Sequence, residues 1–199
     1  TEFGTQYHLG ALQSPRDFQQ SVPLHEYADL NPRIDRMREG EKNVLWPGAV
    51  SWFAKSSGTS TGKSKFLPIT KEAIVQCHFS GGRSELALYI KHNPESRLFE
   101  GQALRLGGST QLESNGHTNH GDLSAIMIQH LPLWAEFRSA PRQQTALMSE
   151  WESKLEAIAE EAIQSRITSL WGVSSWFLVL AHRILEKTGA KNLLEVWPD

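Results

Sequence analysis

A polar stretch at residues 55–70, Lys-Ser-Ser-Gly-Thr-Ser-Thr-Gly-Lys-Ser-Lys-Phe-Leu-Pro-Ile-Thr, has the residue types that bind phosphate. Its hydroxyl groups donate hydrogen bonds, its three lysines add positive charge, and it contains no carboxylate to repel an anion. Gly58 and Gly62 allow positive φ and let the backbone approach a ligand closely. A solvated surface loop has a similar composition, but clustered donors and cations favour a phosphate cradle. The residues that we expect to contact phosphate are Ser56, Ser57, Gly58, Thr59, Ser60, Gly62, Lys63 and Lys65.

Apolar residues flank this stretch on both sides and predict two strands. Trp52-Phe53-Ala54 precedes it, and Phe66, Leu67 and Ile69 follow. A loop held at both ends by strands can keep its backbone N–H groups converged on one ligand.

A P-loop ATPase is an alternative that the spacing disfavours. Its motif needs four residues between the first glycine and the Gly-Lys-Ser, whereas three separate Gly58 from Gly62. A P-loop also opens directly into a helix, but Pro68 belongs here to an extended segment. We therefore expect a strand after the loop.

Composition and charge narrow the classes of protein. The 199 residues are 39% hydrophobic and include seven tryptophans, enough to bury one good-sized core or two small ones. The net charge of −2 gives no overall basic field to recruit nucleic acid or an anionic membrane. The single cysteine, Cys77, rules out an intramolecular disulfide and a cysteine-cluster zinc site. We expect a cytoplasmic protein without a signal peptide or a membrane span.

The first half of the chain predicts three helices and a strand. Ser14-Pro15-Arg16-Asp17 combines an N-cap with a proline at the first helical position, so a helix should run to about Ser21. A second helix follows up to Gly40, and a third begins after Thr70 and is weakened or kinked at Gly81-Gly82. The strand covers residues 102–108. Expected inward-facing residues are Tyr27, Leu30, Ile34 and Met37, then Ala73, Ile74 and Cys77, then Leu104 and Leu106.

The segment from Asn115 to Asp122 contains His117, His120 and Asp122, which could ligate zinc. No regular helix sets their spacing, and the glycines and asparagines are typical of a turn, so we expect no metal site. A helix should follow, capped by Asp122 or Ser124.

Residues 149–187 carry the strongest helical pattern. Ser149-Glu-Trp-Glu152 has the form of a capping box, and an apolar stripe then runs to Ile167, so we expect one long helix broken by Gly172. Residues 173–187 are apolar almost all round and predict a buried helix. The chain therefore predicts an α/β fold, rich in helix with a few short strands.

The polar loop resembles the first nucleotide-binding motif of adenylate-forming enzymes, in the variant Ser-Ser-Gly-Thr-Ser-x-Gly-x-x-Lys-x-x-Pro. Its fixed positions are Ser56, Ser57, Gly58, Thr59, Ser60, Gly62, Lys65 and Pro68. This variant is similar to that of the auxin-responsive Gretchen Hagen family of acyl-acid amido synthetases. The resemblance continues collinearly, from Thr-Glu-Phe-Gly at residues 1–4 to Gly-Val-x-Ser-Trp at 172–176 and Trp197-Pro198.

The resemblance implies a ligase that uses ATP with Mg²⁺ to convert a small carboxylic acid to an acyl-adenylate. An amino acid would then take the acyl group and form an amide bond. The family's later motifs, Tyr-x-x-Ser-Glu and Tyr-Arg-x-Gly-Asp, are absent. Residues 1–199 would thus be part of the N-terminal adenylation domain, without the remainder of that large domain or the small C-terminal domain, and inactive alone.

Val173, Ser175 and Trp176 are candidates for the acyl pocket. An acid with an apolar body needs an apolar slot lined by aromatic groups and a few polar ones, and both types occur together here. The alternative is structural, with Ser174 or Ser175 as an N-cap and Trp176 in the core. For the chain as a whole, the alternative is a non-catalytic helical module that binds a phosphorylated ligand.

Overall fold

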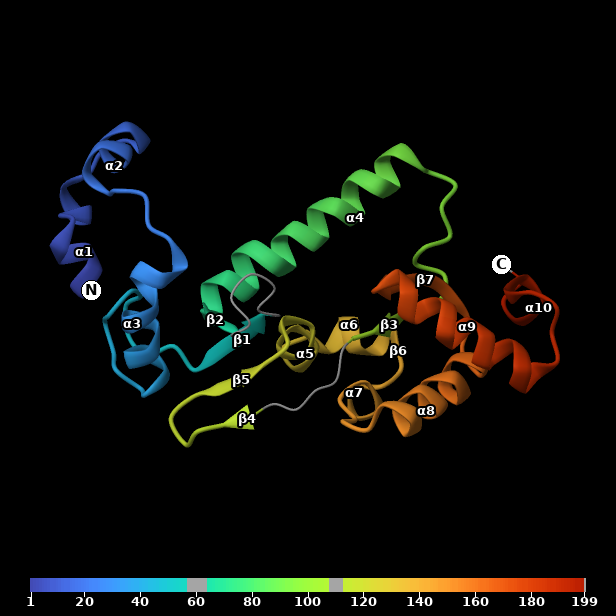
Figure 1. The fold of residues 1–199 in the computed structure, drawn as a ribbon. Coiled ribbons are helices and arrows are strands. Elements are labelled where there is room, and N and C mark those ends of the chain that lie inside the picture. Colours follow the sequence, from blue (N-terminus) through green and yellow to red (C-terminus); the bar gives the residue numbers. More distant parts are fainter. Residues whose placement is uncertain (57–63, 108–112, 199) are drawn as a thin grey trace. The chain divides into compact units, whose positions relative to one another are not determined.

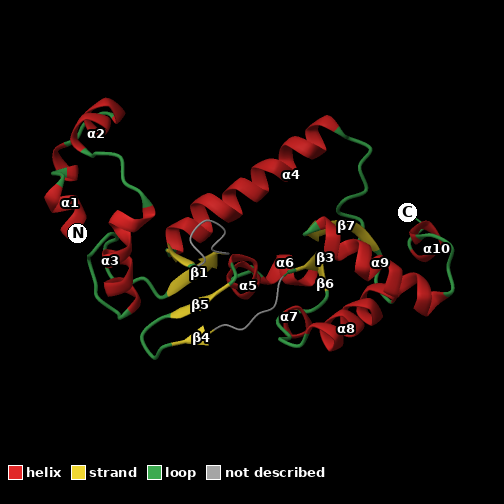
Figure 2. Ribbon diagram, viewed as in Figure 1, coloured by secondary structure: helices red, strands yellow, loops and turns green. Residues whose placement is uncertain are grey.

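The computed structural model describes residues 1–56, 64–107 and 113–198, which form helices and short strands connected by loops (Figures 1 and 2). The chain divides into two compact units, Thr1–Ala73 with Leu112–Gly121, and Ile74–Gln111 with Asp122–Asp199. The first unit contains a four-stranded mixed sheet and the second a three-stranded parallel sheet. The predicted helix-rich α/β class is confirmed.

Helices form the start of the first unit. Ser14 Oγ accepts a hydrogen bond from Asp17 N and the Asp17 carboxylate accepts one from Ser14 N, so the predicted capping box is present. Gly40, with φ of +89°, follows the second predicted helix. The helices of this unit are α1 (Glu2–Gln6), the 3-10 helix η1 (Leu9–Ala11), α2 (Pro15–Ser21) and α3 (Tyr27–Arg38).

The sheet of the first unit has the strand order β2-β1-β5-β4. Its strands are β1 (Trp52–Ser56), β2 (Lys65–Ile69), β4 (Glu113–Ser114) and β5 (Asn119–Gly121). β1 pairs antiparallel with β2 and parallel with β5. Phe53, which is fully buried, packs with Ile34 and Met37 of α3. The two strands predicted around the polar loop are therefore confirmed.

A tight turn joins β4 to β5 where zinc ligands were considered. Asn115 Oδ1 accepts hydrogen bonds from the backbone N–H groups of His117 and Thr118, which confirms the predicted turn. The strands on either side were not predicted. His117 is exposed, whereas His120 is only 6% exposed. Among the described residues, no three His, Cys, Asp or Glu side chains gather as metal ligands would.

The helix after β2 opens in an unexpected form. Thr70 Oγ1 accepts a hydrogen bond from Ala73 N, as expected of a cap, but the first turns are a π-helix, η2 (Ala73–Phe79), before α4 (Ser80–His92). The wider π-helical turn rotates later side chains away from α-helical positions. Cys77 is consequently exposed, and its predicted inward position beside Ile74 is wrong.

The parallel sheet of the second unit has the strand order β6-β3-β7. Its strands are β3 (Gln102–Leu106), β6 (Ser139–Ala140) and β7 (Ile167–Gly172). The helices of this unit that follow α4 are α5 (Leu123–Gln129), α6 (Leu133–Phe137), α7 (Gln143–Ala146), α8 (Trp151–Ile163), α9 (Ser174–Thr188) and α10 (Leu193–Val196). Leu104 and Leu106 face inward, as predicted, and pack against residues of α8 and α9. Asp122 is the N-cap residue of α5, without a side-chain capping bond.

Three predictions for residues 149–188 are wrong. The long helix predicted from Ser149 ends at Ile163, and Ile167 begins a strand instead, because β3 provides hydrogen-bonding partners that spacing alone cannot reveal. Its N-cap is Glu150, whose carboxylate accepts from the backbone N–H groups two and three residues on. The following helix, α9, is buried along one stripe only, with Leu178 75% exposed.

β7 approaches β3 closely at Gly172, and a substitution there tests how much this packing contributes to stability. Its φ is +153°, and a Cβ there would lie 2.2 Å from the carbonyl oxygen of Leu106. We expect Gly172→Ala to lower the free energy of unfolding by about 2 to 4 kcal/mol, through strain and overpacking. Urea denaturation measures this change. Gly81→Ala, where no atom approaches within 4 Å, should be neutral or raise stability by up to about 1 kcal/mol. Equal losses for both variants would contradict the packing argument.

His120 makes stability depend on pH. Burial is the main cause that lowers the pKa of His120 from its ordinary value of 6.5. The positive charges of Arg38 and Lys55 lower this pKa further, whereas the negative charges of Glu113 and Glu39 raise it. Unfolding therefore takes up a proton at mildly acidic pH, so the stabilisation is present above about pH 6.5 and is lost as pH falls below it.

We expect His120→Gln to flatten this dependence, since an amide does not titrate there. Urea midpoints measured from about pH 7.5 down to about pH 5.5 should fall less for His120→Gln than for the unsubstituted chain. His117→Gln, at the exposed turn, serves as the matched control and should follow the unsubstituted chain. Parallel curves for all three proteins would show that burial of His120 does not matter.

Candidate functional site

The two ends of the polar loop are neighbours in the structure. The β1–β2 register pairs Ser56 with Lys65, so residues 57–64 connect two adjacent backbone positions. A strand, not a helix, follows the loop, and the P-loop arrangement therefore does not fit. Ser56 and Lys65 lie at the mouth of the loop. The other predicted phosphate contacts, Ser57, Gly58, Thr59, Ser60, Gly62 and Lys63, lie outside the described residues.

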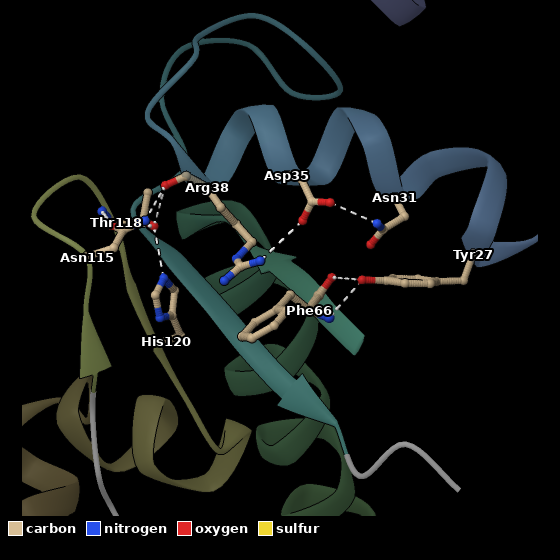
Figure 3. A network of polar contacts seen from close by, with 8 residues as sticks. All are labelled: Tyr27, Asn31, Asp35, Arg38, Phe66, Asn115, Thr118 and His120. Atoms are coloured by element: carbon tan, nitrogen blue, oxygen red, sulfur yellow. Dashed lines mark hydrogen bonds and ion pairs between the residues drawn. The ribbon is translucent and has the colours of Figure 1, made fainter. Parts of the chain in front are cut away.

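Tyr27, at the first position of α3, contacts both residues that lead out of the loop. Its hydroxyl accepts a hydrogen bond from Phe66 N at 2.9 Å and donates one to Phe66 O at 3.3 Å (Figure 3). The Lys65 ammonium lies 5.4 Å from the centroid of the Tyr27 ring, within the range of a cation–π contact.

Arg38, at the last position of α3, links the hairpin to the β4–β5 turn. Its guanidinium lies 3.7 Å from the centroid of the Phe66 ring and pairs with the Asp35 carboxylate at 3.2 Å (Figure 3). Its backbone carbonyl accepts hydrogen bonds from Thr118 Oγ1 at 2.8 Å and Asn115 Nδ2 at 3.0 Å. Both ends of α3 therefore contact the same residue of β2.

Two buried cations in the second unit were missed by sequence reasoning. Lys154, on α8, is 1% exposed and donates a hydrogen bond to Gly107 O at 3.2 Å. Burial lowers the pKa of Lys154, and the Asp122 carboxylate opposes that shift. Arg105, on β3, pairs with Glu136 at 2.8 Å, and burial lowers its pKa as well.

A sequence signal existed for one of these cations. Lys154 lies three residues after Trp151 and four before Ile158, so it interrupts the apolar stripe that defines the buried face of α8. Arg105 had no such signal, because it alternates with two inward leucines as a solvent-facing strand residue would.

The predicted acyl-pocket residues follow the carboxyl end of β7. Register pairing of Leu106 with Gly172 places Gly107 and Val173 at the same end of the parallel sheet, the end where open α/β sheets bind ligands. Val173 is 47% exposed, Ser175 is exposed, and Trp176 is half-buried against Trp151, with ring centroids 5.5 Å apart. The N-cap of α9 is Val173, so neither serine has the capping role of the alternative interpretation.

Within the part of the chain that the structure describes, no helix is both long and apolar enough to cross a membrane.

Comparisons with curated proteins find plant amido synthetases among the relatives of this chain. It is 38% identical over 75 residues to the indole-3-acetic acid-amido synthetase GH3.8 of Oryza sativa subsp. indica, covering 37% of this chain and 12% of that protein. It is 28% identical over 118 residues to the jasmonoyl-L-amino acid synthetase JAR4 of Nicotiana attenuata, covering 58% and 20%.

A solved structure matches the fold over most of the chain. The AtGH3.15 acyl acid amido synthetase in complex with 2,4-DB aligns with a TM-score of 0.72 at 22% identity, covering 94% of this chain and 33% of that one. This chain therefore spans about a third of the length of that synthetase, and its matches span a fifth or less of the two curated relatives.

The model of the GH3 family N-terminal domain matches residues 1–199. The resemblance noted in the sequence is confirmed, and the chain belongs to the GH3 family.

Proposed function

We propose that the protein containing this chain is an ATP-dependent acyl-acid amido synthetase, whose polar loop binds the triphosphate. The observation that carries this proposal is the hairpin at residues 52–69, which brings Ser56 beside Lys65 at the mouth of a loop with an adenylate-forming motif. Membership of the GH3 family and relatives named amido synthetases support it.

The reaction has two steps in this proposal. A carboxylate oxygen of the acid attacks the α-phosphorus of ATP, the bond to the bridging oxygen breaks, and pyrophosphate leaves. The amino group of an amino acid then attacks the acyl carbon, loses a proton and expels AMP. The contribution that we propose for the chain in the first step is electrostatic, because the N–H, hydroxyl and ammonium groups of the loop would offset charge on the departing pyrophosphate.

The residue types in the loop suit phosphate better than a metal ion. Residues 55–70 offer hydroxyl and ammonium groups but no carboxylate, which is the group that usually holds Mg²⁺ in proteins. We infer that Mg²⁺, bound together with ATP, would offset part of the charge on the phosphates. Ser56, Ser57, Thr59, Ser60, Lys63 and Lys65 would contact the phosphate oxygens.

For the acid, we propose a binding site at the carboxyl end of β7 that includes Val173, Ser175 and Trp176. The exposed Val173 and Ser175 and the half-buried Trp176 supply apolar, hydroxyl and aromatic groups there. A binding site for an apolar carboxylic acid needs this combination.

Lys65→Ala tests the phosphate loop. A charge-assisted phosphate contact contributes about 1.5 to 3 kcal/mol, so this variant should weaken acid-dependent pyrophosphate–ATP exchange about 10- to 100-fold while folding is retained. Exchange of labelled pyrophosphate into ATP measures this in the complete protein. Lys71→Ala, which removes an exposed lysine just outside the loop, should exchange at the normal rate. If a Thr59→Ala, Lys65→Ala double variant exchanged pyrophosphate at the normal rate, the loop would have no role in the reaction.

Trp176→Leu tests the acyl pocket. Because leucine keeps the position apolar but changes its shape, the variant should alter the ratio of kcat/KM values between a small aromatic and a long aliphatic acid. The KM for ATP should stay nearly unchanged. A residue with only a core role would instead lower stability by about 1 to 3 kcal/mol and leave the ratio as it was. Trp151→Leu is the control, because it removes the other ring of the Trp151–Trp176 contact. It should lower stability through lost packing and leave the ratio of kcat/KM values unchanged.

A further inference from the structure

The outer edge of β2 is closed by a side chain in place of another strand. Among the strands that the structure describes, β2 lies at the edge of its sheet and pairs with β1. Phe66 N and Phe66 O both bind the Tyr27 hydroxyl, so they point away from β1, and Pro68, two residues on, has no N–H to present on that edge. A single hydroxyl therefore supplies the hydrogen bonds that a further strand would supply at Phe66.

The side chain of Phe66 packs between two other side chains of the same unit. The Arg38 guanidinium covers its ring at 3.7 Å, and the His120 ring meets it edge-on with centroids 5.6 Å apart. Asp35 orients the guanidinium by an ion pair at 3.2 Å, and Asn31 donates to the same carboxylate at 2.8 Å (Figure 3). The strand that leaves the loop thus has a fixed position relative to α3 at its second residue.

Tyr27 also contacts the first residue of that strand. The Lys65 ammonium lies 5.4 Å from the ring centroid, on a side chain that remains half-exposed. An aromatic face holds a cation more weakly than a phosphate oxygen does, because the phosphate contact is charge-assisted. The ring can therefore keep the ammonium close to the mouth of the loop and release it to an anion.

We propose that Tyr27 is a positioning residue for the phosphate loop, which fixes the backbone after Lys65 and keeps the ammonium of Lys65 at the mouth. This proposal rests on the proposed function, since it assigns Tyr27 a role at the same phosphate site. Tyr27 touches no phosphate, and it acts through Lys65 and Phe66. The Tyr27 hydroxyl sets the direction of β2 at Phe66, and the Tyr27 ring sets the position of the Lys65 ammonium when no anion is bound.

Two substitutions separate the tasks of Tyr27. Tyr27→Phe removes the hydroxyl and keeps the ring, so the Phe66 amide should exchange its hydrogen faster, and the Kd for inorganic tripolyphosphate should rise roughly tenfold. Tyr27→Leu removes the ring as well and should raise the Kd further. Tyr7→Phe, at the C-cap of α1, is the matched control and should leave both measurements unchanged.

The experiment measures tripolyphosphate binding, amide exchange and pyrophosphate–ATP exchange on the complete protein and its variants. A KM for ATP that rises in Tyr27→Phe, while the KM for the acid stays constant, supports positioning. A residue with only a structural role would lower the melting temperature and leave the KM for ATP unchanged, which would overturn the proposal. Tripolyphosphate binding equal to that of the unsubstituted protein would also overturn it.

The same measurements separate this proposal from the proposed function. A complete protein that binds tripolyphosphate through a Tyr27-dependent site, but exchanges no pyrophosphate with any acid, would contradict the synthetase and keep the positioning role. Normal exchange by the unsubstituted protein and by Tyr27→Phe alike would contradict the positioning role and keep the synthetase.

Discussion

The antiparallel pairing of β1 with β2 is the interaction on which the candidate site depends. Five successive pairs, from Trp52 with Ile69 to Ser56 with Lys65, set the separation of the two ends of the loop. The loop itself is rich in glycine and serine, residues that lose much conformational entropy when ordered. Because the β1–β2 pairing fixes both ends of the loop in the absence of a ligand, ligand binding has less conformational entropy left to remove.

Local patterns in the sequence predicted the elements whose stability is local. The capping box at Ser14 and Asp17 needs only residues three apart, and the hairpin strands carry apolar runs next to a polar loop, so both were predicted correctly. β7 was predicted as helix because Ile167 continues the apolar spacing of α8. Its strand form depends on β3, more than sixty residues earlier in the chain, and no pattern within β7 reports that partner. The strands β4 and β6 have two residues each, too few to show any period.

The same distinction separates the parts of the candidate site. The clustered hydroxyls, glycines and lysines of residues 55–65 predict a phosphate-binding loop, because the groups that such a loop needs are consecutive in the sequence. Tyr27 and Lys154 act on residues 39 and 47 positions away, and their types are common in helices. Only the interrupted apolar stripe marked Lys154, and nothing marked Tyr27 as the partner of Phe66. Conversely, the apolar residues of α9 predicted burial all round, but a helix buries only the faces for which the fold supplies neighbours.

The surroundings of Lys65 and Lys154 suit them to different kinds of electrostatic task. Lys65 is half-exposed at the edge of its sheet, so its ammonium keeps part of its water and can turn toward an anion with little desolvation. Lys154 is enclosed in the first turn of α8, where burial and the positive end of the helix dipole both disfavour a cation. Its ammonium donates a hydrogen bond to the carbonyl oxygen of Gly107, at the carboxyl end of β3, and breaking that bond would remove a charged donor from a buried oxygen. A charge that meets a diffusing anion therefore suits a position like that of Lys65. A charge like that of Lys154 instead holds the end of β3, which is paired with the end of β7 where the acid site is proposed.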